Sequence, residues 1–315
     1  MTTDLTYLQS ITIGALQGVT ELFPISSLGH SVLVPALIGG SWQHLVTESS
    51  TATSEGSPYL AFVVALHVAT ACALLLFYWR DWVRIIGAFF HTLRVRRIET
   101  SADRLAWIIV VATIPVGITG LALEHTFRTL FAKPVAAAAF LTVNGVILLA
   151  GERLRRRAET RDPVYAGVGT TDVPVGSAAA GSARVGTSRS LDTLSLREAG
   201  IVGLFQTLAL FAGISRSGVT IVAGLLRGLD HEDAAKLSFL LATPVIFAAG
   251  VLKVPSLFGP AGDGIHGQVL VGAAVAFVAA LLAITFLTRW FTTRTLTPFA
   301  IYCLIFGGIC LARFA

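Results

Sequence analysis

The sequence predicts an all-helical, polytopic membrane protein that is built as an inverted-topology repeat. Hydrophobic residues make up 54% of the chain and charged residues 13%, and the mean hydropathy is +0.76, whereas roughly a quarter of the residues of a soluble domain are charged. The net charge is +5. Because the basic residues gather in a few loops beside apolar stretches, they indicate membrane topology and not a nucleic-acid partner.

Six apolar stretches come close to the roughly 20 residues that a membrane-spanning helix needs. They cover about 59–79, 105–123, 135–151, 237–257, 267–288 and 298–314. Two longer stretches, about 5–38 and 196–229, are interrupted at their centres, the first by Pro24 and Gly29 and the second by Gly213 and Gly218. Broken helices are tolerated at membrane depth where the loose backbone is buried in protein or lines a polar cavity. We therefore predict two re-entrant helical hairpins beside six membrane spans.

The two interrupted stretches follow one pattern. Residues 17–30 read QGVTELFPISSLGH, and residues 206–218 read QTLALFAGISRSG. A shift of 189 positions superposes a glycine, a glutamine and a serine: Gly14 meets Gly203, Gln17 meets Gln206 and Ser26 meets Ser215. This agreement predicts a duplicated unit, with residues 1–157 as the first repeat and 196–315 as the second.

The distribution of basic residues predicts how the repeats are oriented. Loops 80–104 and 152–197 are rich in arginine, whereas loops 39–58 and 258–266 contain neither Lys nor Arg. The basic side should be cytoplasmic, which places both termini outside and makes residues 158–195, rich in small and polar residues, a disordered cytoplasmic linker. Each repeat then has one hairpin and three spans but enters from the opposite face. Such repeats usually place the site near the midplane, at their interface.

The second interruption has the chemistry of a phosphate cradle. Ser215 and Ser217 stand where a helix would restart after Gly213, and the first turn of a helix offers backbone N–H groups to anions. Arg216 adds a planar fork of donors that suits phosphate oxygens. The alternative is an arginine that pairs with a nearby carboxylate and holds the two halves together.

The first interruption could form an activated nucleophile. Ser27 and His30 are three residues apart and Gln17 and Glu21 are four apart, so each pair can share a helix face. A fold at Pro24 would bring Glu21 towards the hydroxyl and the imidazole, and such a triad can activate a nucleophile. Ser26 and Ser27 could cap the returning helix, as Ser215 and Ser217 could cap theirs. Taken alone, Ser27 could be no more than such a cap and His30 a satisfied interior histidine. His67, inside a span, is more often a core hydrogen-bonding residue than a ligand.

Residues 18–30 and 213–221 closely resemble the two motifs of the bacterial undecaprenyl-diphosphate phosphatases, which are also called bacitracin-resistance proteins. The resemblance extends to 239–244 and 298–302 and covers nearly the whole chain apart from the linker. It implies an inner-membrane hydrolase that converts a polyprenyl diphosphate to the monophosphate for reuse in peptidoglycan synthesis. It also implies a site open to the periplasmic side and a divalent cation, Mg or Ca, with no organic cofactor.

The resemblance assigns catalytic positions to Glu21, Ser27, His30 and Arg216. We expect Ser27 as nucleophile, His30 as its base and Glu21 as the group that orients His30; the alternatives are His30 as nucleophile and His30 acting on water. The expected phosphate-binding residues are Ser26, Ser215, Arg216, Ser217, Gly218 and Thr220, with Gln17 and Gln206 in support. Glu21 would be the metal ligand, although Gln17 stands where many relatives have a second glutamate.

Two other functions remain open from the residues. The first is a lipid-phosphate transporter or flippase without hydrolysis, because inverted repeats with broken helices are a transporter architecture. The second is a lipid phosphatase of the phosphatidic-acid type. That family needs a histidine six residues after the arginine, where this chain has Val222. Lipid chain length, cation identity and oligomeric state, including a possible homodimer, are not fixed by the sequence.

Overall fold

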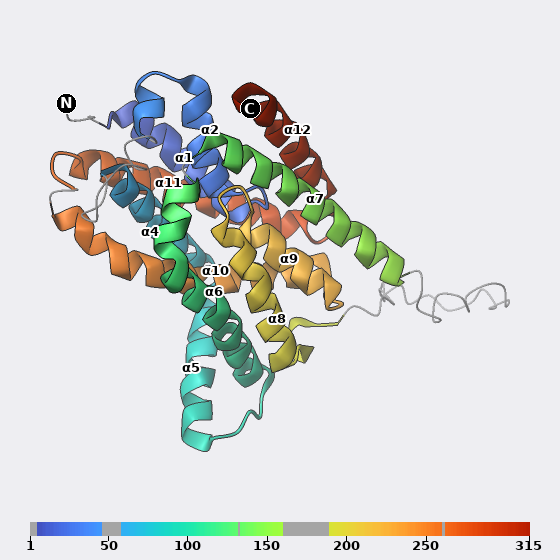
Figure 1. Cartoon of the computed structure of the whole chain (residues 1–315). Helices are drawn as coiled ribbons and strands as arrows, with labels where there is room; N and C mark the ends of the chain where they lie inside the picture. Colours follow the sequence, from blue (N-terminus) through green and yellow to red (C-terminus); the bar gives the residue numbers. More distant parts are fainter. Residues whose placement is uncertain (1–4, 46–57, 132, 160–188, 260–261) are drawn as a thin grey trace, which may run out of the picture.

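The computed structural model describes residues 5–45, 58–131, 133–159, 189–259 and 262–315. Its described part is an all-helical assembly (Figure 1). The first half contains α1 (Tyr7–Leu22), α2 (Ser27–Ile38), α4 (Pro58–Phe77), α5 (Trp79–Val95), α6 (Ser101–Phe131) and α7 (Pro134–Glu159). The second half contains η2 (Leu191–Thr193), α8 (Leu196–Thr207), η3 (Leu208–Leu210), α9 (Arg216–Leu226), α10 (His231–Lys253), η4 (Val254–Phe258), α11 (His266–Trp290) and α12 (Thr297–Phe314).

Within the described residues, five helices are long and apolar enough to cross a membrane. They lie at Ser101–Ala122, Pro134–Ala158, His231–Gly250, His266–Trp290 and Thr297–Phe314. A sixth candidate span is a bent pair, in which α4 and α5 meet at 86°. The chain is therefore a multi-pass membrane protein, and the predicted fold class is confirmed at this level. The predicted spans 105–123, 135–151, 237–257, 267–288 and 298–314 all fall largely within these helices.

The prediction of a loop over 80–104 was wrong, because α5 occupies most of it. Trp82, Ile85 and Phe89 recur at helical spacing and pack towards α6 in the main hydrophobic core, while arginines fill part of the remaining surface. The charges suggested a loop, whereas the apolar face makes a helix.

The two interrupted stretches are helix pairs separated by short breaks. Residues 23–26 separate α1 from α2, and residues 208–215 lie between α8 and α9. The breaks themselves contain Pro24 and Gly213, and Gly213 has a φ of +115°, which favours glycine. Gly29 and Gly218 were predicted as breakers but lie inside the first turns of α2 and α9.

Most of the predicted linker 158–195 lies outside the described residues. Its last residues, from 189 onward, are anchored to the second half. The Arg189 guanidinium donates to the Glu198 carboxylate at 2.7 Å, and the Leu191 N–H donates to Asp233 at 2.8 Å. These contacts hold residues 189–195, the end of the predicted linker, against the second half.

The first helix of each half packs against a helix of the other half. In Figure 1, α1 lies beside α11 and α8 lies beside α6. Both contacts depend on a glycine: a Cβ on Gly14 would meet the Gly272 carbonyl, and a Cβ on Gly203 would meet the Ala112 carbonyl. Gly14 and Gly203 occupy equivalent positions in the two interrupted stretches, so small residues allow the same close approach in both halves.

We predict that Gly14→Ala and Gly203→Ala each lower the free energy of unfolding by about 1–3 kcal/mol, because the added methyl group would meet backbone that cannot move aside. Thermal unfolding of purified protein in detergent measures the effect. Gly117→Ala is the matched control, since a Cβ there has no heavy atom within 4 Å. Equal melting temperatures for all three variants would contradict this account of the packing.

Candidate functional site

The two breaks meet in the protein interior and cap the helices that follow them. Ser26, with a φ of 70°, is the N-cap of α2, and its hydroxyl accepts from the Gly29 N–H at 3.3 Å. Ser215 is the N-cap of α9 and accepts from the Gly218 N–H at 3.2 Å. The prediction that serines cap the restarting helices is thus confirmed for Ser26 and Ser215.

Hydrogen bonds join one break to the other. The Ser217 hydroxyl donates to the Phe23 carbonyl at 3.1 Å, and the Ser215 hydroxyl lies 3.4 Å from the same oxygen. In return, the Gly213 N–H donates to the Ser26 hydroxyl at 3.2 Å. A Cβ on Gly29 would lie 3.0 Å from the Gly213 Cα. Loose backbone groups of each break are therefore satisfied by the other, as burial in the protein interior requires.

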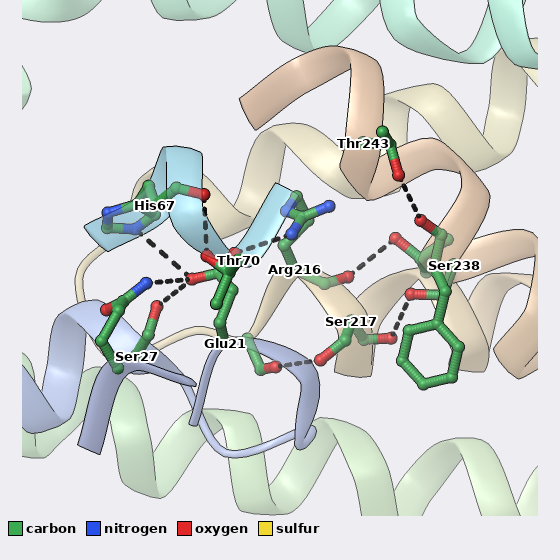
Figure 2. Close-up of polar contacts among 12 residues, drawn as sticks. Glu21, Ser27, His67, Thr70, Arg216, Ser217, Ser238 and Thr243 are labelled. Atoms are coloured by element: carbon green, nitrogen blue, oxygen red, sulfur yellow. Dashed lines mark hydrogen bonds and ion pairs between the residues drawn. The ribbon is translucent and has the colours of Figure 1, made fainter. Parts of the chain in front are cut away.

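The Glu21 carboxylate is the centre of the site (Figure 2). Its Oε1 accepts from the Arg216 guanidinium at 2.7 Å. Its Oε2 accepts from the Ser27 hydroxyl at 2.5 Å and from the Gln17 amide at 3.0 Å. The His67 Nε2 lies 3.3 Å from the same oxygen. One carboxylate thus gathers groups from α1, α2, α4 and α9.

The orientation of His67 follows from its other ring nitrogen. Nδ1 lies 2.8 Å from the Val63 carbonyl of its own helix, and a carbonyl can only accept, so Nδ1 carries a hydrogen. The second nitrogen then faces Glu21. For that contact to be favourable, a proton must lie between His67 and Glu21, either on the imidazole or on the carboxyl group.

A cavity of about 250 Å³ opens beside these groups. Glu21, Ser27, His67 and Arg216 form part of its wall, with Ser26, Ser215 and Gln206. The larger apolar side chains in the rest of the wall are Leu28, Val64, Val116, Leu210, Ile214, Val245 and Ile246. The Arg216 NH1 and the Gln206 Oε1 are buried and have no hydrogen-bond partner among the residues that the structure describes. The cavity therefore combines an apolar wall with a cationic side chain that can donate further hydrogen bonds.

His30 lies apart from this cluster. Its Nδ1 donates to the Ser26 carbonyl at 2.7 Å, and its Nε2 lies 2.7 Å from the Tyr302 hydroxyl. The ring stacks on Tyr302 and Phe306 of α12. Both ring nitrogens are therefore engaged away from Ser27, whose hydroxyl proton points to Glu21 instead. The arrangement of Ser27 on His30 that the sequence suggested is not the one in this structure, and the catalytic role of His30 stays a prediction.

The other expected phosphate-binding residues divide into two groups. Ser26, Ser215 and Arg216 line the cavity. Ser217 and Thr220 are buried and donate to the carbonyls of Phe23 and Arg216, while the Gly218 N–H is used by the Ser215 cap. Ser217, Gly218 and Thr220, all within the described part of the chain, do not line the cavity. In this structure, they stabilise α9 and its contact with the first break.

The sequence model described as "Bacitracin resistance protein BacA" matches residues 10–309. The chain belongs to the BacA family. A protein of Frankia alni named "Undecaprenyl-diphosphatase 2" is 66% identical, with 99% of each chain covered. An "Undecaprenyl-diphosphatase" of Mycolicibacterium paratuberculosis is 58% identical over 100% of this chain and 99% of the relative. Another from Acidiphilium cryptum is 43% identical over 98% of each.

Sequence reasoning missed two residues that this BacA-family site contains. His67 was weighed only as a core histidine, yet it faces the carboxylate. Asn144 of α7 was not considered, and it bonds both breaks. The only available signal was a polar side chain inside an apolar span, which is costly unless it is paired. Neither residue belongs to the two motifs, so spacing along the chain could not connect them with Glu21.

The residues around Glu21 do not fit a resident divalent cation. Hard cations prefer several oxygen ligands, usually including more than one carboxylate. Here, both carboxylate oxygens accept from donors, one of which is a guanidinium. Within the described residues, no group of three or more His, Cys, Asp or Glu side chains could hold a metal. The expectation that Glu21 is a metal ligand therefore gains no support from its surroundings.

We predict that Ser26→Ala destabilises the BacA-family fold more than Ser26→Gly. Both variants lose the bonds from the Gly29 and Gly213 N–H groups, each worth about 0.5–1.5 kcal/mol. Glycine, however, adopts a positive φ without strain, whereas alanine keeps that strain. Thermal unfolding of the two variants measures the difference. A glycine variant that melts at or below the alanine variant would show that backbone strain at Ser26 is unimportant.

Proposed function

We propose that this chain is an undecaprenyl-diphosphatase: it hydrolyses a polyprenyl diphosphate to the monophosphate and inorganic phosphate. The observation that carries the proposal is the cavity in which Ser27, Glu21 and Arg216 meet beside an apolar wall. Full-length relatives named for this activity support it. Such a reaction returns the lipid carrier to peptidoglycan synthesis and agrees with the family's description as bacitracin resistance proteins.

The two kinds of wall suit the two parts of a lipid diphosphate. Arg216 binds the phosphates, because its NH1 is a buried donor without a partner among the described residues and guanidinium matches phosphate oxygens. The first isoprene units lie on the apolar side chains of α4, α6 and α10, and the rest of the tail remains in the bilayer. When Arg216 binds phosphate, its interaction with the Glu21 carboxylate weakens. The carboxylate can then accept a proton.

Ser27 is the proposed nucleophile, and Glu21 is the group placed to take its proton. The Ser27 Oγ attacks the terminal phosphorus, its proton passes to Glu21 Oε2, and the bond from phosphorus to the bridging oxygen breaks. The lipid monophosphate leaves with that electron pair. Water then attacks the phosphoserine, inorganic phosphate departs, and the proton on Glu21 returns to Ser27 Oγ. Arg216 stabilises the charge on the transferring group in both steps.

In this proposal, His30 has a structural role and stabilises the backbone at Ser26, next to Ser27. Its hydrogen bond to the Ser26 carbonyl holds the strained residue directly before the nucleophile. The alternatives, in which His30 attacks phosphorus or activates water, require the ring to leave Tyr302 and turn towards the cavity. If Mg or Ca is needed, as the resemblance implies, the cation would arrive with the diphosphate, whose oxygens are good ligands for it.

The proposal includes an inverted repeat with two re-entrant hairpins. Its support is that Gly14 and Gly203, which occupy equivalent positions, both pack against a helix of the opposite half. The basic loops then face the cytoplasm, and the cavity opens to the periplasmic side of the inner membrane. A homodimer is compatible with this arrangement, but it is not needed to complete the site.

Phosphate release from a polyprenyl diphosphate by purified protein in detergent tests the proposed function, with and without divalent cation. Release by the parent protein supports a hydrolase. A protein that binds the diphosphate and releases no phosphate under either condition would instead be a lipid-phosphate transporter, which the broken helices would also suit.

We predict that Arg216→Ala lowers kcat by at least about 10²–10³-fold, because it removes the charge that stabilises the transferring phosphoryl group. Arg216→Lys keeps the charge but loses the fork, so it should recover only part of the rate. Arg227→Ala, at the far end of α9, is the control. Near-normal turnover by the Arg216→Ala variant would overturn the assignment of this residue to phosphate binding.

We predict that Ser27 and Glu21 act as one catalytic unit. Ser27→Ala and Glu21→Gln should each remove most of the turnover, and the double variant should be scarcely slower than either single variant, because residues that act together are not additive. The kcat values of the four proteins give the result. If the double variant loses the product of the two single effects, Glu21 does not take the Ser27 proton.

A further inference from the structure

Asn144 joins the two breaks in the interior of the molecule. It lies on α7 and is 0% exposed. Its side-chain Nδ2 donates to the Pro24 carbonyl at 3.0 Å, and its Oδ1 accepts from the Ser215 N–H at 2.9 Å. The same Nδ2 lies 3.4 Å from the Cys303 sulfur of α12. One amide thus bonds main-chain groups of both interruptions.

These two bonds satisfy backbone groups that helix geometry leaves free. Pro24 lies in the break between α1 and α2, and Ser215 is the N-cap of α9. Their polar groups are outside regular helical pairing and are buried in the protein, so they need partners from elsewhere in the chain. Asparagine supplies a donor and an acceptor on one short, rigid side chain.

The two bonded positions stand next to the reacting residues. Pro24 precedes Ser27 by three residues, and Ser215 directly precedes Arg216. A shift of either break would therefore change the position of the nucleophile relative to the guanidinium. Because the ends of α2 and α9 come from different halves of the chain, their separation depends on contacts such as these and not on local sequence.

We infer that Asn144 is a positioning residue of the site: it fixes the Ser27-bearing and Arg216-bearing breaks relative to each other. It does not touch the cavity and makes no bond to Glu21, so it acts through the backbone of the two breaks. For its effect on turnover, the inference rests on the proposed function. Its structural part, the bridge between the breaks, stands on the contacts alone.

Two variants separate the two bonds. Asn144→Leu is close in size and removes both. Asn144→Asp keeps an acceptor for the Ser215 N–H, whereas its carboxylate cannot donate to the Pro24 carbonyl. Thr142→Val is the matched control, because Thr142 lies two residues away on α7 and its hydroxyl bonds only the Ala138 carbonyl of the same helix among the bonds described.

Steady-state kinetics with a polyprenyl diphosphate give the first readout. Asn144→Leu should lower kcat about 10²-fold while KM stays within about threefold, since misplacement of reacting groups by about 1 Å has an effect of that order. Asn144→Asp should lie between the leucine variant and the parent, and Thr142→Val should match the parent. A folded leucine variant with a kcat within about threefold of the parent would overturn the inference.

Amide hydrogen exchange, followed by mass spectrometry, gives a readout that does not depend on turnover. Peptides that contain Ser215 should exchange faster in Asn144→Leu than in the parent and the control, and remain protected in Asn144→Asp. Unchanged exchange in the leucine variant would show that no bridge is lost. If that variant fails to fold, the intermediate kcat predicted for Asn144→Asp decides, and a parent-like kcat refutes the inference. Absence of hydrolysis by the parent would count against the proposed function alone, because the exchange still tests the bridge.

Discussion

The contact between the Glu21 carboxylate and the Arg216 guanidinium is the interaction on which the site depends. It joins α1 of the first half to α9 of the second across 195 positions of sequence. A carboxylate or a guanidinium buried alone would be destabilising, and loss of one partner of a buried pair typically costs about 3–5 kcal/mol. The pair therefore requires both breaks to be present and correctly placed, and the surrounding hydrogen bonds serve that placement.

The broken helices follow from the same constraint. A continuous helix would pair its backbone N–H and C=O groups within itself. Interruption at Pro24 and at Gly213 frees backbone groups, which the other break then satisfies through Ser26, Ser215 and Ser217. The glycines that allow close approach are part of this arrangement. The result is a small polar centre whose cavity is otherwise walled by apolar side chains, which suits a substrate with a charged head and a hydrocarbon tail.

Much of the site could be predicted because its residues lie within two short motifs. Intramembrane polar residues are costly, so Glu21, Ser27 and Arg216 were conspicuous, and local spacing indicated that Ser26 and Ser215 cap helices. The predictions that failed concerned contacts between residues that are far apart in the sequence. The ring of His30 points to Tyr302 on α12, 272 positions away, and His67 comes from a separate span. The arginines of residues 80–104 also led to the prediction of a loop where α5 lies. The apolar face of this helix is recognised from its packing on α6.

The central claim is that Ser27, activated by Glu21, carries the phosphoryl group between the lipid and water. Rapid acid quenching with a diphosphate labelled in its terminal phosphate, followed by peptide mapping, tests it most directly. The account predicts label on the peptide that contains Ser27, as an acid-stable phosphoserine, which is absent from Ser27→Ala. Alkali-stable, acid-labile label on His30 after a parallel quench in alkali, or turnover by Ser27→Ala at the rate of the parent, would contradict it.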